Sequence, residues 1–316
     1  MRPEQLEDLV SLSAPTLHPD GTFAVVAVSH PSFAVDAEVG QLWRVPLDGG
    51  NPRRITRGFC DTAPKFSPDG ALLAFVRSQP GKPGQLFVVP ADGGEPMQVT
   101  DQRLGVGWFE FSDDSRRIVF ISRVPEDGRY GTVDDIDAAP ESPRAFSDFQ
   151  TRHNGVGWFR DRPAQVFVVD VPDPAAEPIF EATGQGKAHD VDVPARFPEA
   201  TRLTDDDIDW ASPIFDADGS VLASANRKGD DTLECELWRL REGAKPESLT
   251  AGLSLSARGP RRSGDRLFFV AGSVGEGVDF VGHHGTVWLA GDAPRQLVDI
   301  TAVSYTHLRA HETPEH

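Results

Sequence analysis

Ser273 lies in the segment of the sequence that comes nearest to the nucleophile motif of serine hydrolases. In that motif, G-x-S-x-G, a sharp turn exposes the serine hydroxyl for attack on a carbonyl carbon. The segment reads Ala271-Gly272-Ser273-Val274-Gly275, so alanine stands where the first glycine is required. It follows an apolar run, and we interpret it as a turn between strands. The sequence contains no complete G-x-S-x-G motif, and we predict no catalytic residue in it.

Histidines and acidic residues with the side-chain chemistry of metal ligands occur at two internal places. The pair His283-His284 lies in a loop between glycines, where a zinc site would need further ligands that we cannot name. The acidic run from Asp205 to Asp209 lacks the glycine and the bidentate glutamate of an EF-hand loop. We interpret the pair as an ordinary loop and the run as a solvated turn. We therefore predict no metal site and no cofactor.

Composition narrows the class of protein further. The 316 residues include 31 basic and 49 acidic ones, for a net charge of −18. Such a charge argues against a nucleic acid or an anionic membrane as the main partner. Cys60 and Cys235 are too few for a disulfide framework, and we expect both to be buried as small apolar side chains. The segment Met1–Asp8 has no apolar region typical of a signal peptide, so we expect a cytoplasmic protein.

A tight turn between two strands recurs along the chain. Proline presets φ at the second turn position, aspartate bonds to its own backbone, and glycine tolerates a positive φ. The turn sequences are Leu17-His18-Pro19-Asp20-Gly21, Phe66-Ser67-Pro68-Asp69-Gly70, Phe111-Ser112-Asp113-Asp114-Ser115 and Phe215-Asp216-Ala217-Asp218-Gly219. Each turn leads into an apolar run, a third strand with an aromatic residue, and a short fourth strand such as Gln98-Val99-Thr100. The sequence therefore predicts a repeated unit of four strands.

The period of this repeat predicts an all-β fold of the β-propeller class. The first turns are spaced about 45 to 50 residues apart, which is typical of four-stranded propeller blades. We predict about five blades over residues 1–302 in an incomplete ring, the fifth with a degenerate turn around Ser263-Gly264-Asp265. A β-sandwich would not repeat the same turn and aromatic strand in order. Blade three carries insertions at about 125–163 and 171–200, and Pro3–Val10 is predicted to form a short helix.

Several of these segments carry a family resemblance. The opening helix with Ser13–Gly21, the turn Phe66–Gly70, the strand pair Leu86–Thr100 and the insertion motifs resemble serine peptidases of the prolyl oligopeptidase family. The acylaminoacyl-peptidase and dipeptidyl-aminopeptidase branch is the most similar. The insertion motifs are Arg129-Tyr130-Gly131-Thr132, Gly155–Pro163 and Gln165–Asp170. The resemblance covers about residues 3–302.

The resemblance implies a propeller that caps a separate catalytic domain. That domain is an α/β-hydrolase module with Ser, Asp and His, and it is expected to follow the propeller beyond the end of this chain. Its absence implies that this chain alone has no peptidase activity, although the parent protein is a serine-type peptidase. The propeller would restrict access to short peptides. By the same resemblance, Arg129, Tyr130 and Arg160 are candidate substrate-binding residues, and the partners are the hydrolase domain and a peptide substrate.

Alternatives remain open for the origin of the last residues and for the function of the propeller. Residues 303–316 break the repeat and hold three of the nine histidines, His307, His311 and His316. This tail resembles translated sequencing-adapter read-through. A metal-binding tail and an affinity tag are the alternative interpretations. The propeller could also be a stand-alone TolB-like or WD40-like scaffold that binds proteins. A complete five-bladed enzyme of the glycosidase type would need carboxylates converging on the inner strands, which the sequence does not obviously offer.

Overall fold

The structure, a computed structural model, forms two compact units. The first comprises residues 1–123 and 167–202, and the second comprises residues 124–166 and 203–316. The described residues are 2–133, 141–147, 150–180, 183, 195–229, 232–274, 285–291 and 293–297. The predicted tail at 303–316, the His283-His284 pair and parts of both predicted insertions lie outside them. Within the described residues the fold is almost entirely β, as predicted.

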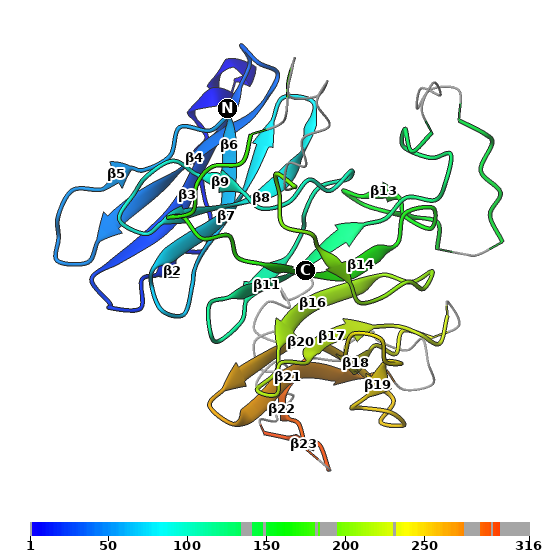
Figure 1. The fold of residues 1–316 in the computed structure, drawn as a ribbon. Coiled ribbons are helices and arrows are strands. Elements are labelled where there is room, and N and C mark those ends of the chain that lie inside the picture. The colour runs from blue at the N-terminus through cyan, green and yellow to red at the C-terminus, as the bar shows by residue number, and fades with distance from the viewer. Residues whose placement is uncertain are drawn as a thin grey trace, which may run out of the picture. The chain divides into compact units, whose positions relative to one another are not determined.

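The first unit contains the first three predicted blades: blades one and two are joined in one nine-stranded sheet, and blade three forms a four-stranded sheet (Figure 1). Blade one consists of β1 (Ser11–Leu12), β2 (Thr16–Leu17), β3 (Phe23–Ser32), β4 (Ala37–Pro46) and β5 (Arg53–Arg54). Blade two consists of β6 (Cys60–Phe66), β7 (Leu72–Gln79), β8 (Lys82–Pro90) and β9 (Met97–Gln98). Blade three consists of β10 (Phe109–Phe111), β11 (Arg117–Arg123), β14 (Ala164–Asp170) and β15 (Thr201–Arg202), and the division between the units falls within β14.

The second unit contains the remaining two blades and a small hairpin. Blade four consists of β16 (Trp210–Phe215), β17 (Val221–Ala225), β18 (Glu236–Leu240) and β19 (Glu247–Ser248). Blade five consists of β20 (Leu255–Ser263), β21 (Arg266–Ser273), β22 (Thr286–Leu289) and β23 (Arg295–Gln296). The hairpin pairs β12 (Arg152–His153) with β13 (Gly157–Trp158), inside the predicted insertion of blade three. Each blade is an antiparallel meander, so the four-stranded repeat read from the sequence is confirmed.

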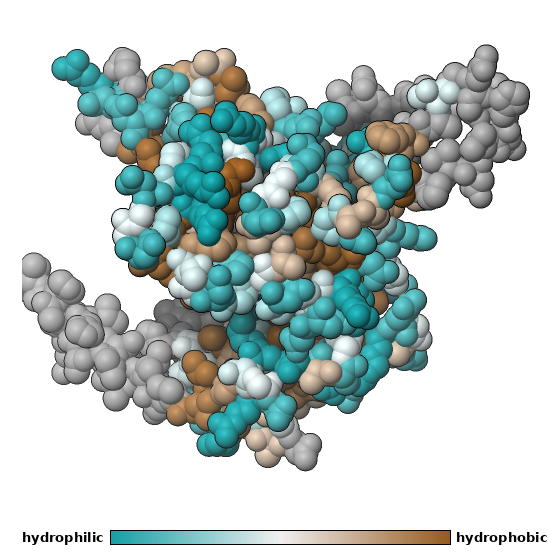
Figure 2. Space-filling model, turned by 60° about the vertical axis from the view of Figure 1, so that its left-hand side comes forward, coloured by the Kyte–Doolittle hydropathy of each residue, from teal (hydrophilic) through white to brown (hydrophobic). Residues whose placement is uncertain are grey.

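The N-terminal segment differs from the predicted helix in type and length. It is a 3-10 helix, η1 (Pro3–Asp8), that ends before Leu9 and Val10. Both residues are exposed, as is Leu6, so the apolar face expected of this helix is not covered. None of the helices that the structure describes is long and apolar enough to span a membrane. In the view of Figure 2, hydrophilic residues cover most of the described surface, and apolar residues show between them.

The first strand of most blades contains the same irregularity. In β6, β16 and β20 the register with the next strand shifts by one residue at a bulge. The extra residue has a positive φ and is followed by proline, as in Ala63-Pro64, Ser212-Pro213 and Gly259-Pro260. Proline has no N–H to leave unpaired at the interruption, and a bulge sharpens the local twist of the strand. Of these three residues only Gly259 lacks the Cβ that makes a positive φ sterically costly.

A short backbone link joins the start of the third strand of one blade to the first strand of the next. The Gly40 N–H donates to the Phe59 carbonyl at 3.1 Å, and the Val106 N–H donates to the Gly84 carbonyl at 2.8 Å. In the second unit, Cys235 forms a parallel bridge with Ser256. A Cβ at Gly105, next to Val106, would lie 2.7 Å from the Gly84 carbonyl oxygen, so the close approach at this link requires glycine.

In each of the first four blades, a buried threonine connects the end of the fourth strand to the third strand. The Thr hydroxyl oxygen at the end of the fourth strand accepts the backbone N–H of an apolar residue in the third strand. The pairs are Thr56 with Leu42 at 2.9 Å, and Thr100 with Leu86, Thr204 with Val166 and Thr250 with Leu237, each at 3.0 Å. The fourth strands are only two residues long, so each has few ladder hydrogen bonds of its own. The threonine therefore satisfies a buried donor that the short strand leaves unpaired.

The face of blade five differs from the same face in blade two. Val270 and Val287 are directly opposite each other and are 46% and 41% exposed. Their repeat equivalents, Val76 and Leu86, are also a cross-strand pair and are 8% and 0% exposed. The repeat thus places apolar side chains at positions that are buried in blade two, and in blade five these side chains are open to solvent.

Replacing Thr100 by valine tests the threonine closure. The variant keeps the side-chain volume but leaves the Leu86 N–H without an acceptor in a buried position. We expect the free energy of unfolding to fall by about 1–3 kcal/mol, measured by urea unfolding with tryptophan fluorescence. The exposed Thr62→Val is the matched control, with an expected change within about 0.5 kcal/mol. Equal effects of the two variants would contradict a stabilising role for the buried hydroxyl.

The blade-four turn predicts a specific acid dependence. The Asp218 carboxylate accepts the Ser220 hydroxyl and the Ser220 N–H, and these hydrogen bonds lower its pKa from 3.8 to about 2. A carboxylate with a lowered folded pKa stabilises the fold above the unfolded pKa, and this stabilisation is lost as the pH falls through the folded value. The stability advantage of wild type over Asp218→Asn should therefore be full above about pH 4 and shrink toward pH 2. Urea midpoints at pH 5 and pH 2.5 measure it, and a difference that stays constant between them would contradict the assignment.

Candidate functional site

The predicted substrate-binding segment of the blade-three insertion contains a buried ionic cluster. Its centre is Asp161, which is 7% exposed. Arg144 Nε donates to Asp161 Oδ2 at 2.5 Å, and the Tyr130 hydroxyl donates to Oδ1 at 3.0 Å. Arg129 Nε lies 3.9 Å from the same carboxylate. Two of the three predicted residues, Arg129 and Tyr130, therefore come together around one acidic side chain.

A second carboxylate completes this cluster. Glu141 lies 3.0 Å from Arg144 Nη2 and 3.8 Å from Arg129 Nη1, and it accepts the Tyr130 backbone N–H. Arg129 also donates to the carbonyl oxygens of Ser142 and Pro143, so its guanidinium binds both carboxylates and the chain beside them. These contacts cross-link the two sides of the insertion. We refer to Arg129, Tyr130, Glu141, Arg144 and Asp161 as the insertion cluster.

The surroundings raise the pKa of two groups of the insertion cluster, Tyr130 and Arg144. Burial, and then the hydrogen bond to Asp161, raise the pKa of the Tyr130 hydroxyl. The hydrogen bond to Asp161 also raises the pKa of the Arg144 guanidinium. The Arg162 guanidinium lies over the Tyr130 ring, 4.6 Å from its centroid. A neutral phenol and paired guanidinium groups suit positioning and recognition, whereas a general base needs a pKa near the working pH.

Arg160 lies apart from the insertion cluster. Its Nε donates to the Gln150 carbonyl at 2.9 Å, and its guanidinium lies 4.9 Å from the centroid of the Phe159 ring. Phe159 stacks on His153 with centroids 4.2 Å apart. The sequence analysis named Arg129 and Tyr130, which lie in one cluster, but it did not indicate their partners Glu141, Arg144 and Asp161. Their opposite charges within one insertion were the available signal.

The other candidate residues from the sequence, Ser273 and the acidic run from Asp205 to Asp209, lie where a structural role accounts for them. Ser273 ends strand β21, which agrees with its interpretation as a residue at a strand end; Gly275 lies outside the described residues. Asp206 accepts the Trp210 indole N–H at 2.7 Å, and Asp209 accepts the Ala164 N–H at 2.8 Å. The described part of the chain contains no group of three or more His, Cys, Asp or Glu residues that could hold a metal ion.

The two cysteines, which we expected to be buried, are half-buried. Burial raises the pKa of both the Cys60 and the Cys235 thiols. The thiolate is the nucleophilic form of cysteine, and a raised pKa disfavours it at neutral pH. Neither side chain therefore has the environment of a catalytic thiol.

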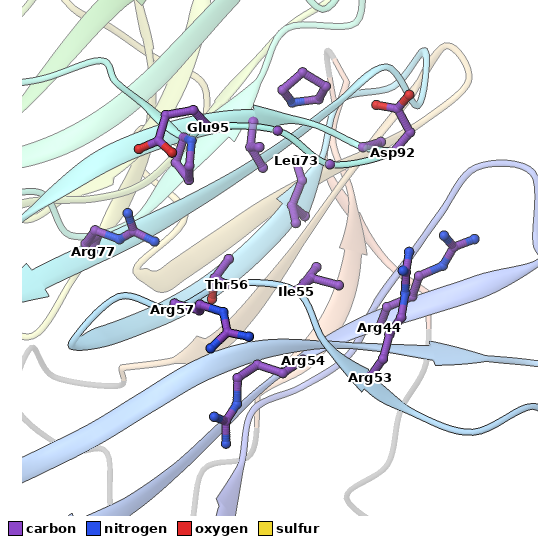
Figure 3. Close-up of a pocket in the computed structure, with 16 residues that line it drawn as sticks. Arg44, Arg53, Arg54, Ile55, Thr56, Arg57, Leu73, Arg77, Asp92 and Glu95 are labelled. Carbon is purple, nitrogen blue, oxygen red and sulfur yellow. The ribbon is translucent and has the colours of Figure 1, made fainter.

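A pocket of about 490 Å³ in the first unit collects positive charge that no sequence motif indicated. Arg44 in β4 and Arg53 in β5 are directly opposite each other at one end (Figure 3). Arg57 and Arg77 lie toward the other end in this view, and Ile55 lies between the two groups. We refer to this site as the arginine pocket. Its remaining lining comes from Arg54, Thr56, Leu73 and the segment from Val89 to Pro96, including Asp92 and Glu95.

The arginines of this pocket differ in their partners. Arg77 forms a two-point ion pair with the fully buried Asp61, at 2.7 and 2.9 Å. The Arg44 guanidinium lies over the Phe23 ring at 3.7 Å from its centroid. Arg53 and Arg57 are exposed, and among the described residues neither has a carboxylate within ion-pair distance. The site can therefore offer at least two uncompensated guanidinium groups to a ligand.

Comparison with known proteins identifies relatives among peptidases. No family model matches the chain. Over 155 residues it is 35% identical to dipeptidyl-peptidase 5 of Porphyromonas gingivalis, a match that covers 48% of this chain and 22% of that protein. Over 228 residues it is 25% identical to the uncharacterized peptidase YuxL of Bacillus subtilis, covering 71% of this chain and 31% of that protein. The matches thus span less than a third of either relative's length.

Solved structures give the fold. The acylaminoacyl peptidase of Pyrococcus horikoshii superposes with a TM-score of 0.61 at 15% identity, covering 93% of this chain and 40% of that chain. The chain is a β-propeller that resembles those of peptidases. The putative TolB of Agrobacterium tumefaciens is also similar, with a TM-score of 0.53 at 20% identity over 92% of this propeller and 81% of that chain. The resemblance predicted from the sequence is confirmed, and TolB-type propellers share the fold.

Replacing Asp161 by asparagine tests the insertion cluster. The variant keeps the side-chain shape but removes the charge that Arg129 and Arg144 face, so the insertion should open more often. We expect trypsin to cleave after Arg129 and Arg144 about tenfold faster than in wild type, followed by mass spectrometry of the fragments. The exposed Asp127→Asn in the same insertion is the control. Unchanged cleavage rates in both variants would show that the cluster does not hold the insertion.

Proposed function

We propose that this chain is the non-catalytic propeller portion of a serine-type peptidase that acts on short peptides. In this proposal an α/β-hydrolase domain follows the propeller and carries the Ser, Asp and His residues of the reaction. The propeller limits which substrates reach that domain. The observation that carries the proposal is the 35% identity to dipeptidyl-peptidase 5 over 155 residues, because it lies at the level of sequence as well as fold.

The open face of blade five supports a longer parent protein. The exposed pair of Val270 and Val287 occupies positions that are buried in blade two. Covering apolar surface of this kind with another sheet or domain lowers the free energy, because the surface is removed from water. A further blade or the hydrolase domain would provide that cover in the parent.

The insertion of blade three is the proposed route by which the propeller contacts substrate. Arg129 and Tyr130 hold the insertion in shape through Asp161, so they act as positioning residues. Arg160 lies on the same insertion beside the aromatic ring of Phe159. A guanidinium on a fixed segment can bind the carboxylate terminus or a carbonyl of a short peptide.

A stand-alone scaffold of the TolB type is the second candidate. One observation favours it: the putative TolB of Agrobacterium tumefaciens is covered over 81% of its length by this chain, whereas the acylaminoacyl peptidase is covered over 40%. In this alternative the propeller surface binds another protein and no hydrolase domain follows.

The genomic reading frame downstream of codon 302 tests the proposal. We expect a G-x-S-x-G motif within the next few hundred codons. We also expect that the protein expressed from the longer frame reacts covalently with a fluorophosphonate probe, which labels activated serines, while the 316-residue chain does not. A natural stop codon directly after the propeller would contradict the peptidase proposal and favour the scaffold.

A further inference from the structure

The charge that lines the arginine pocket is opposite in sign to the net charge of the protein. The chain carries a net charge of −18, yet five arginines line this one pocket against Asp92 and Glu95. Arg44 and Arg53 form a directly opposed cross-strand pair. Like charges in that position destabilise a sheet. In the described part of the chain no carboxylate lies within ion-pair distance of either guanidinium to offset the repulsion.

We propose that the arginine pocket binds a short acidic peptide segment with two carboxylates about four residues apart. One carboxylate would be held by Arg44 and Arg53 at one end of the pocket, and the other by Arg57 at the other end. Guanidinium groups suit this task because their planar donors match the two oxygens of a carboxylate. An anionic ligand would also relieve the repulsion between the two opposed arginines.

The spacing of the arginines sets the spacing of the ligand charges. Arg53 and Arg57 are four residues apart in a segment that begins as β5 and continues with a hydrogen bond from the Ile55 N–H to the Leu42 carbonyl of β4. Four extended residues span about 13 Å. A second extended chain with carboxylates at its first and fifth residues therefore presents them at the same separation.

The middle of the pocket favours a peptide over a small anion or a polyphosphate. The exposed Ile55 side chain lies between the two charged ends (Figure 3), and Pro90 and Pro96 add apolar surface to the lining of the same pocket. An apolar side chain at the centre of a peptide could cover that surface. Asp92 and Glu95 line the same pocket and limit how many anionic groups it can hold, which disfavours a polyanion such as a nucleic acid more than a ligand with two carboxylates.

Two arginines of the pocket, Arg44 and Arg77, are already ordered in the absence of a ligand. The Phe23 ring supports the Arg44 guanidinium, and the ion pair with buried Asp61 fixes Arg77. Guanidinium groups that are already ordered lose less side-chain entropy on binding. Arg53 and Arg57 lack such support among the described residues, so they supply the free charges and are the residues to mutate.

The test is a fluorescence anisotropy titration of the 316-residue chain with a labelled five-residue peptide. The peptide has blocked termini, glutamate at both ends and leucine at the centre, and the control peptide has glutamine at both ends. The variant Arg53→Gln/Arg57→Gln removes the proposed contacts. The matched control is Arg266→Gln/Arg295→Gln, because these two exposed arginines of the second unit give the same change in net charge.

We expect saturable binding of the glutamate peptide to wild type and to the control variant, with affinity at least about tenfold weaker in Arg53→Gln/Arg57→Gln. Arg57→Lys, which keeps the charge but loses the two-point geometry, should be intermediate. Equal affinity in the two double variants would overturn the proposal, as would equal binding of the glutamine peptide. Binding of inorganic phosphate as tight as that of the peptide would show a small-anion site and would also overturn it. Thermal unfolding of each variant confirms that the fold is retained.

Discussion

A hydrogen bond between a buried threonine hydroxyl and the backbone of the neighbouring strand is the interaction on which the first four blades depend. Each fourth strand is two residues long, too short to hold its place by ladder bonds alone. The threonine side chain extends the pairing by one bond and meets a donor that would otherwise be buried and unpaired. Once that edge is closed, the apolar side chains of the inner strands can pack against the next sheet. In unit one this core includes Phe23, Leu42 and Phe75, and in unit two Leu222 and Phe269.

The repeat could be predicted from sequence because its signals are local. The Asp-Gly turns, the apolar runs and the aromatic third strands each depend on neighbouring residues, and all of them occur in the structure as predicted. The bulges in the first strands were less accessible, because a positive φ at Ala63 or Ser212 before proline runs against the usual preference of those residues. The N-terminal segment was predicted as a longer helix, and its exposed Leu9 shows that amphipathic spacing alone does not ensure a covered face.

The sites were harder to predict than the fold because their residues meet through the fold. Arg129 and Tyr130 were identified from a motif, but their partner Asp161 lies 31 residues from Tyr130 in sequence. The arginine pocket brings together β4, β5, β7 and the turn after β8, and it contains no motif. Both sites place positive charge on an otherwise acidic chain, one in a paired and buried form and one in an open form. This difference is why the insertion cluster suits positioning, while the pocket is suited to binding a ligand.

Hydrogen–deuterium exchange at single-residue resolution tests the threonine closure most directly. The amides of Leu42, Leu86, Val166 and Leu237 donate to the four threonine hydroxyls, and the account predicts that they exchange among the slowest in their blades. Protection of all four close to that of the central strands would support a blade edge held shut by this one bond. Exchange of these amides as fast as that of the exposed turn residues would contradict it.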